Sequence, residues 1–315
     1  MISRHHLRAK VLQAIYAHEM NPMEVMATGE KKLVQSVENY YTLFLYLFSL
    51  IPEFKRYRLN KMEDAKAKFH PTIEDLNPNT RFVDNAVIAQ IENNAELQKA
   101  WRNHRISWNN DLDVIIQIFQ EVTALKEYNS YLANETQNYE EDKYLVLAII
   151  EKVFAVSNLL HWFFEEKNLH WVDDYNEALL ALYKNISFFS LKKGNSCKIL
   201  PLFKSEKDDV EFYKSLYRKT LLNNAAFGEL IETRLKNWEA ERVLGIDMIL
   251  MKMAICELTQ FPTIPIKVTL NEYIELAKWY SSTKSGLFVN GLLDKVVVEL
   301  KTQNQIHKTG LGLID

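Results

Sequence analysis

Residues 282–295 read STKSGLFVNGLLDK, and the residues after them continue a regular apolar pattern. The apolar side chains recur at the spacing of one helix face, which predicts an amphipathic helix over 287–302. Phe288 falls about 110° from the centre of the apolar stripe and lies at its border, while Asn290 and Asp294 point away from it. The residues of the stripe itself are Val289, Leu292, Leu293, Val296 and Leu300.

A capping pattern lies just upstream of this helix. Thr269 and Glu272 have the spacing of a capping box, which predicts a helix that starts at Thr269. Pro262 and Pro265 keep the preceding helix from continuing into it, and Pro52 is expected to end the second helix of the chain. Periodic apolar patterns predict helices over 4–19, 30–51, 82–102, 109–133, 139–166, 174–189, 208–236, 239–259, 270–280 and 287–302.

The composition also favours an all-α fold. Glycine (8) and proline (7) make up 15 of the 315 residues, about 5%, where roughly 12% is usual. No glycine occurs between Gly29 and Gly194. A doubly wound α/β protein needs glycines in its tight turns and phosphate-binding loops, so that class is excluded. The 48% hydrophobic content is ample for a buried core and excludes a disordered chain.

Charge, cysteines and hydropathy narrow the class further. The net charge is −3, so any nucleic-acid site must be a local basic patch. Cys256 lies in the apolar stretch 248–258 and is expected to be a reduced core residue, and two distant cysteines form no structural zinc site. The longest apolar run, 41–51, has eleven residues, against about twenty needed to span a bilayer. We expect a soluble, cytoplasmic protein that does not enter the membrane.

The sequence carries no motif that points to an enzyme. The chain has no HExxH, no P-loop and no Gly-x-Ser-x-Gly elbow, which are the patterns of zinc hydrolases, phosphate-binding enzymes and serine hydrolases. None of the eight histidines has a metal-ligand or nucleophile partner at a useful spacing. We therefore expect no catalytic residues, no metal site and no cofactor.

Basic residues cluster on the first helix. Arg4 and Arg8 fall near the line of the apolar side chains Val11 and Ile15, so they prolong the core stripe beyond the point where the core is expected to cover it. They form either a cationic ledge for RNA phosphates or an ordinary solvated, salt-bridged helix start.

The segment at 284–290 has side chains that suit single-stranded RNA. Phe288 could stack on a base, Ser285 offers a hydroxyl, and Lys284 and the free amides of the helix start could bind a phosphate. The alternative is that Phe288 is a residue at the edge of the core.

Three stretches carry a family resemblance. Residues 270–278 (LNEYIELAK) and 285–295 (SGLFVNGLLDK) closely resemble the C-terminal signature of the NusB family of transcription antitermination factors. Residues 4–16, which include RAKVLQAIY at 8–16, resemble the arginine-rich first helix of that family. The resemblance covers about 1–20 and 208–302, and roughly 50–200 resembles an insertion.

The resemblance implies a fold and a set of partners. It implies an all-helical fold of two small bundles, and binding of the boxA sequence of ribosomal RNA leaders together with NusE, a ribosomal protein of the small subunit. That complex would join the antitermination assembly on RNA polymerase. Glu241 and Asp247 match the acidic residues that face NusE. By the same resemblance, RNA would be held by Arg4, His5, Arg8, Lys10, Lys284, Ser285, Phe288 and Asn290. His5 and His6 stand where arginines are common, which reduces the charge near pH 7.

The expected organisation follows from these segments. N-terminal helices (1–50) and a C-terminal bundle (208–302) flank an inserted helical region (51–200), and 303–315 forms a flexible tail. Within the insertion, 109–190 has weak similarity to the C-terminal bundle. For example, Asp174 and Glu177 parallel Thr269 and Glu272. The similarity reflects either a degenerate repeat that docks on the first bundle or two bundles with like patterning.

Two other functions remain as alternatives. The first is a protein-interaction module of the same fold that has lost RNA binding. The second is an RNA-modifying enzyme, because some RNA cytosine methyltransferases carry a domain similar to NusB. No glycine-rich cofactor loop occurs in this chain, so the second alternative would need a catalytic part on another protein.

Overall fold

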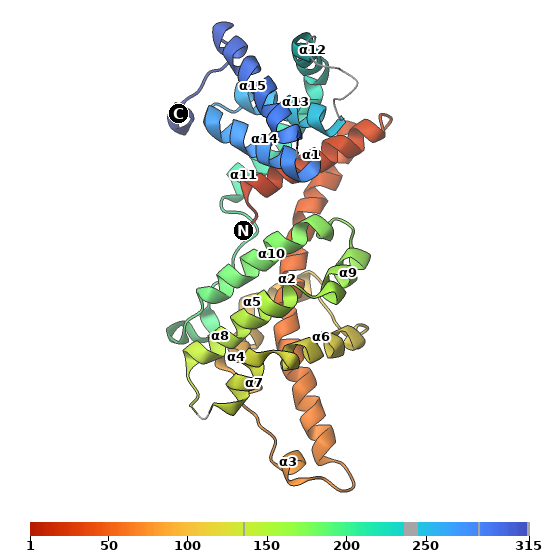
Figure 1. Cartoon of the computed structure of the whole chain (residues 1–315), viewed down its shortest axis with the longest axis vertical. Helices are drawn as coiled ribbons and strands as arrows, with labels where there is room; N and C mark the ends of the chain where they lie inside the picture. The colour runs from red at the N-terminus through yellow and green to blue at the C-terminus, as the bar shows by residue number, and fades with distance from the viewer. Residues whose placement is uncertain (135, 236–244, 283, 314–315) are drawn as a thin grey trace. The chain divides into compact units, whose positions relative to one another are not determined.

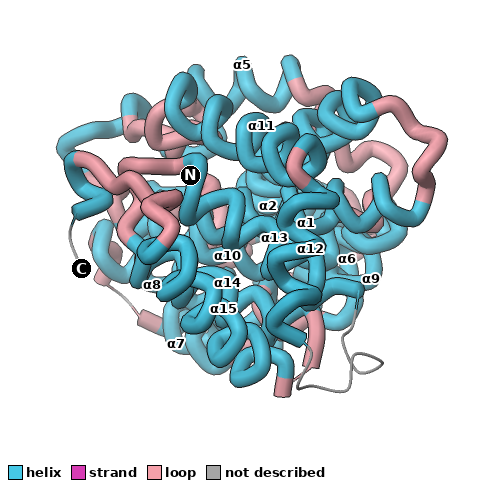
Figure 2. The backbone as a smooth tube through the Cα atoms, turned by 90° about the horizontal axis from the view of Figure 1, so that it is seen from above, coloured by secondary structure: helices cyan, strands magenta, loops and turns pink. Residues whose placement is uncertain are grey.

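The computed structural model describes residues 1–134, 136–235, 245–282 and 284–313. Every long regular element in these ranges is a helix, and none is a strand (Figures 1 and 2). The all-α fold class expected from the sequence is therefore confirmed.

The chain divides into two compact units. Unit 1 comprises Met1 and residues 38–202, and unit 2 comprises residues 2–37 and 203–315. The first expected boundary was 50/51, whereas the packing places 38–50 in unit 1. The chain passes into unit 2 at 202/203, between the expected insertion (51–200) and the expected C-terminal bundle (208–302).

Unit 2 is built around helix α13 (Gly245–Gln260), in which a continuous run from Met253 to Leu258 is buried. Cys256 lies in this run as a buried free thiol, as expected for a core residue. Burial raises the pKa of Cys256 to about 12. The helices that pack against α13 are α1 (Arg4–Met20), α11 (Glu206–Leu222), α12 (Asn224–Leu235), α14 (Ile266–Tyr280) and α15 (Ser285–Thr302).

Unit 1 contains the second part of α2 (Met26–Lys66) and a set of shorter elements (Figure 1). Several predicted long helices are broken here, because Asn94 and Ser157 cap new helices inside them by accepting hydrogen bonds from backbone amides. The elements are α3 (Ile73–Leu76), α4 (Ala86–Glu92), α5 (Ala95–Asn103), α6 (Leu112–Ala124), α7 (Lys126–Ala133), α8 (Tyr139–Ile149), a π-helical turn (Ile150–Phe154), α9 (Asn158–Lys167), α10 (Trp171–Ser187) and a 3-10 turn (Leu191–Ser196).

Pro52 does not end α2, so that prediction is wrong. The helix continues through the proline to Lys66. Proline removes one helical hydrogen bond and crowds the carbonyl four residues earlier. Phe48, Ile51 and Phe54 are all buried around it, and this packing outweighs the local cost.

Aromatic side chains form the centre of unit 1. Trp108 stacks on Phe163 and donates from Nε1 to Ser49 Oγ over 2.9 Å. Trp171 is also buried, and its Nε1 donates to the backbone oxygen of Asn39. These aromatic residues thus pack inside unit 1, whereas Trp162 is exposed.

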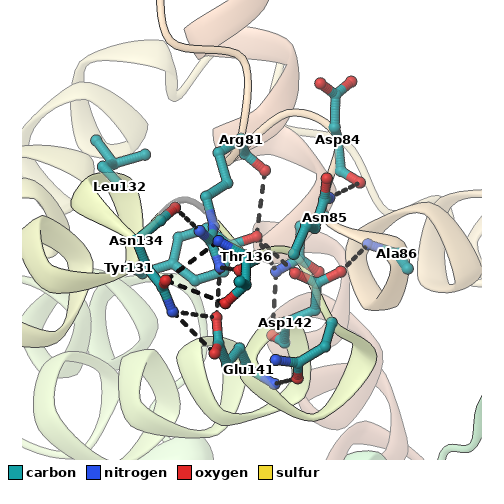
Figure 3. A network of polar contacts seen from close by, with 12 residues as sticks. Arg81, Asp84, Asn85, Ala86, Tyr131, Leu132, Asn134, Thr136, Glu141 and Asp142 are labelled. Atoms are coloured by element: carbon teal, nitrogen blue, oxygen red, sulfur yellow. Dashed lines mark hydrogen bonds and ion pairs between the residues drawn. The ribbon is translucent and has the colours of Figure 1, made fainter.

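Arg81 joins two loops of unit 1 (Figure 3). Its guanidinium donates to the backbone oxygens of Asn134 and Thr136 and pairs with Glu141. It also lies over the ring of Tyr131, at 4.4 Å from the centroid. The segment before α4 is therefore fixed to the loop that precedes α8.

The tail after α15 is packed, although the sequence predicted a flexible segment. The Thr309 amide donates to the backbone oxygen of Pro262, and Lys308 Nζ donates to the backbone oxygen of Phe261 over 3.0 Å. Ile306 packs on a small cluster of Leu258, Ile266 and Val297. Apolar contact and backbone hydrogen bonds therefore hold a segment without helical periodicity.

Among the residues described, no single helix has both the length and the apolar character to cross a membrane. One bent pair, Tyr139–Phe154 and Asn158–Lys167, passes on length and composition alone, with a bend of 74° between its members.

Candidate nucleic-acid interface

Arg4 lies at the start of α1 on the surface of unit 2. Ser3 caps this helix by accepting from the His6 amide, and no acidic residue occurs in its first turn. Arg4 Nε pairs with Asp209 Oδ1 of α11 at 3.2 Å, and the guanidinium lies 4.9 Å from the centroid of the Phe212 ring. The side chain keeps 43% of its surface exposed, so a phosphate can still reach it.

His5 is held by a carboxylate of α14. Its Nδ1 lies 2.8 Å from Glu272 Oε2, and its side chain is 35% exposed. Burial alone would raise the pKa of Glu272, but the hydrogen bond from His5 and the charge of Arg8 lower that pKa below its ordinary value. Glu272 is therefore ionised near neutral pH.

Arg8 lies inside unit 2, contrary to the expectation that it contacts RNA. Its side chain is 2% exposed, and Nε and Nη2 each donate over 2.8 Å to the two oxygens of Glu257. Nη1 pairs with Glu272 at 3.2 Å. Helices α13 and α14 cover the part of the core stripe that the sequence placed in solvent. Lys10 is buried as well.

Glu257 is the centre of a buried polar cluster. Besides Arg8, it accepts from Thr269 Oγ1 at 2.9 Å and from Tyr273 OH at 3.3 Å. Burial raises the pKa of Tyr273 well above its ordinary value, so this hydroxyl remains a donor. The predicted capping box is therefore wrong, because α14 begins at Ile266. Thr269 lies inside the helix, where its hydroxyl donates to Glu257. A carboxylate in the otherwise apolar run 253–258 was the sequence signal for this cluster.

The parallel helix start expected at Asp174 is also absent. Asp174 is the fourth residue of α10, as Thr269 is of α14, and both are buried. The two segments are thus similar in having a buried polar residue at the fourth position of a helix. Neither Asp174 nor Thr269 begins a helix.

Asp247 of α13 holds the start of α15 through a hydrogen bond. Ser285 is buried, and its hydroxyl donates to Asp247 Oδ2 over 2.9 Å. Asp247 is 3% exposed, which contradicts its expected role on a partner-facing surface. Glu241, the other residue of that expectation, lies outside the described residues.

Other residues of the segment remain at the surface. Lys284 is exposed, and Phe288 and Asn290 are half-buried, which agrees with a border position for Phe288. Leu287 is 80% exposed and Trp279 is 77% exposed. Trp279 is an exposed aromatic residue that was not among the residues predicted from the sequence. Its position off the apolar stripe of α14 was the signal that could have predicted its exposure.

The eight residues that were expected to bind RNA therefore differ in their exposure to solvent. Arg4, His5, Lys284, Phe288 and Asn290 are at least partly exposed, whereas the remaining three are buried. Among the described residues, no three His, Cys, Asp or Glu side chains lie close enough together to hold a metal ion. The exposed set offers cations, an aromatic ring and an amide, which are the groups that bind single-stranded nucleic acid.

Comparison with known proteins decides the family. The model of the NusB family matches residues 176–298. The transcription antitermination protein NusB of Desulforapulum autotrophicum is 34% identical to this chain over 127 residues, which cover 38% of the chain and 86% of that protein. The chain belongs to the NusB family.

Two further relatives have the same printed name. NusB of Salinibacter ruber is 43% identical over 104 residues, or 33% of this chain and 65% of that protein. NusB of Chloroherpeton thalassium is 48% identical over 79 residues, or 25% of this chain and 37% of that protein. This NusB-family chain thus spans less than two thirds of the length of either relative. No solved structure matches it.

The family match has a defined place in the structure. It begins within α10 and includes α11 through most of α15, so α1 and the greater part of unit 1 lie outside it. The NusB signature accordingly falls on the helices that carry Glu257, Asp247 and Phe288.

Proposed function

We propose that this chain is an RNA-binding transcription antitermination factor. It binds boxA-like single-stranded RNA of ribosomal RNA leaders together with NusE and acts within an assembly on RNA polymerase. The family membership supports the class of function. The observation that carries the RNA part is the exposed Arg4 guanidinium, held beside Asp209 and over Phe212 at the start of α1.

In this proposal the exposed residues contact RNA and the buried residues support them. Arg4 and Lys284 supply charges for phosphates, and Phe288 and Asn290 supply stacking and hydrogen bonds to bases. Arg8 and Ser285 act beneath this surface. Arg8 fixes Glu272, which holds His5, and Ser285 fixes the start of α15 through Asp247.

A gel-shift titration tests the proposal. The full chain is titrated into boxA-like RNA and into a scrambled RNA, each with and without NusE. We expect a shift with boxA-like RNA that strengthens when NusE is added. Arg4→Gln should weaken it, whereas Lys301→Gln, which removes one exposed charge near the end of α15, should not. Equal binding to both RNAs and no effect of NusE would contradict the proposal.

A second candidate function is a protein-interaction module without RNA binding. It is favoured by two carboxylates that lie beside the basic residues of α1, because Asp209 pairs with Arg4 and Glu272 pairs with His5. In that case NusE would bind with unchanged affinity in the presence and absence of RNA, and neither RNA would shift.

A further inference from the structure

The core-facing stripe of α2 changes its chemistry towards the end of the helix. Ile51 and Phe54 are 1% and 0% exposed. At the same helical spacing the stripe continues with Arg58, Lys61 and Ala65. Cations that only solubilise a helix belong on its outer face. Here Met62 remains buried, Arg58 is half-buried and Lys61 is exposed, so both cations can reach an anionic occupant in front of this part of the helix.

A groove lies in front of this stripe. It has a volume of about 440 Å³ and runs between α2 and the segment 72–79, which we call the strap. A cavity of this size is in the range of sites for small molecules or single nucleotides. On the α2 side the groove is lined by Arg58, Lys61, Met62 and Ala65, and on the strap side by Thr72, Glu74, Asp75, Asn77, Pro78 and Asn79.

The strap is fixed at its first end. Thr72 and Asp75 form a capping box at the start of α3, and Lys68 Nζ donates to the two oxygens of Asp75 over 2.9 and 3.1 Å. Asp75 accepts both contacts, and they lower its pKa below the ordinary value. Its charge is thus already balanced by Lys68.

The second end of the strap is fixed to the rest of unit 1. Asn79 Nδ2 donates to the backbone oxygen of Leu132 over 2.9 Å, and Asn79 Oδ1 accepts from the Arg81 amide. Arg81 itself is held by the network of Figure 3. The groove therefore has two walls that are both anchored.

The two walls differ in their chemistry. Within the described part of the chain, Arg58 pairs with no carboxylate, and Lys61 lies over the Tyr57 ring at 5.8 Å. On the opposite wall, Glu74 offers a carboxylate, and Asn77 donates its amide nitrogen to the backbone oxygen of Ile73, which leaves the amide oxygen as an acceptor. One wall attracts phosphate, and the other accepts from hydroxyl or amino groups.

We propose that this groove binds a nucleotide of single-stranded RNA and forms a second RNA contact in unit 1. Phosphates lie against Arg58 and Lys61, and the ribose 2′-hydroxyl or a base amino group donates to Glu74 and Asn77. A lipid surface would favour cations on a convex face without acceptors opposite them. The inference rests on the proposed function for the identity of the ligand, but the groove lies outside the family match at 176–298.

The salt dependence of RNA binding tests the groove. The full chain is titrated with a long unstructured RNA that carries a boxA-like sequence, between about 50 and 200 mM salt. For Arg58→Gln/Lys61→Gln we expect the slope of log affinity against log salt to fall by about 1.4, or about 0.7 for each phosphate of a single strand. Arg56→Gln/Lys66→Gln is the matched control, because it removes the same charge from α2 at positions that do not line the groove. Melting curves of both variants check that they fold.

A second variant tests the acceptor wall. Glu74→Gln should reduce the preference for RNA over DNA of the same sequence, because only RNA carries the 2′-hydroxyl. An unchanged preference for RNA over DNA would show that Glu74 and the strap side of the groove do not contact the 2′-hydroxyl.

The outcomes separate this inference from the proposed function. If Arg4→Gln weakens binding and the groove variant equals the control, the groove inference is wrong and the proposed function stands. If ultraviolet cross-links of RNA map to 55–79 but not to 1–20, the groove stands and the ledge at Arg4 fails. If the groove variant loses binding only to phosphatidylglycerol vesicles, the occupant is a lipid surface and the RNA inference is overturned.

Discussion

Arg8 of α1 and Glu257 of α13 form an ion pair with two parallel hydrogen bonds of 2.8 Å in the core of unit 2. Their side chains are 2% and 0% exposed, so neither charge is solvated. Burial alone would lower the pKa of Arg8, but the carboxylate of Glu257 raises it overall. Arg8 therefore stays charged at any ordinary pH, and its pair with Glu257 joins α1 to α13.

Removal of one partner should strongly destabilise unit 2. Arg8→Met leaves Glu257 buried with hydroxyl donors only, and breaking a buried pair in this way costs about 3–5 kcal/mol. Urea denaturation of the full chain, followed by circular dichroism, measures the loss. The double variant Arg8→Met/Glu257→Leu should recover part of it, because no unpaired charge remains. A single variant as stable as the wild type would show that the pair contributes nothing.

Glu272 should make stability fall in acid. Its folded pKa is lowered below the ordinary value of 4.5, so the unfolded state binds its proton more tightly. The contribution is present above pH 4.5 and is lost as pH falls through the folded pKa. Glu272→Gln should show a smaller decline of unfolding free energy between neutral pH and acid. Glu275→Gln, an exposed neighbour on the same helix, is the control and should decline as the wild type does.

Phe288 is half-buried at the border of the apolar stripe of α15, so one variant can test whether its ring stacks on a base or belongs to the core. If the ring stacks on a base, Phe288→Ala should cost about 1–3 kcal/mol of RNA binding. If the ring instead belongs to the core, the same change costs about 3–5 kcal/mol of stability. Thermal melting and RNA titration of one variant measure both quantities. We expect the larger effect on binding, and a large drop in melting temperature with unchanged affinity would make Phe288 a core residue.

The hydroxyl of Ser285 should matter through Asp247. Ser285→Ala removes the hydrogen bond to Oδ2, and the other carboxylate oxygen, Oδ1, has no hydrogen-bond partner among the described residues. Loss of a partner for a buried charged group costs about 1–3 kcal/mol or more. Ser282→Ala, which alters a half-exposed hydrogen bond in the same turn, should cost less. Denaturant midpoints of the two variants compare them directly.

The packed tail can be released by one methyl group. A Cβ at Gly312 would overlap the backbone oxygen of Pro262. Overpacking of this kind costs about 1–3 kcal/mol. Gly312→Ala should therefore speed hydrogen exchange at the Thr309 amide, which donates to the same oxygen. Gly291→Ala meets no atom within 4 Å and should leave this exchange unchanged.

The sequence by itself determined the fold class and several local features. Scarce glycine and the helical spacing of apolar residues indicated an all-α chain, and neither signal depends on tertiary contacts. The helix predicted from residue 139 does begin at Tyr139, where the Asn138 side chain accepts from the Glu141 amide. The position of Cys256 in an apolar run indicated burial, and the family signature at 285–295 identified the family.

The tertiary structure alone decided which charged residues reach solvent. Arg8 has the sequence pattern of an exposed ledge, but its partner Glu257 lies 249 residues away along the chain. The same holds for Ser285 with Asp247, and for Thr269, whose hydroxyl serves Glu257 and caps no helix. Helical periodicity gives the direction of a side chain but not what covers it. Long-range packing supplies the cover, and the free energy of a buried charge depends on that partner.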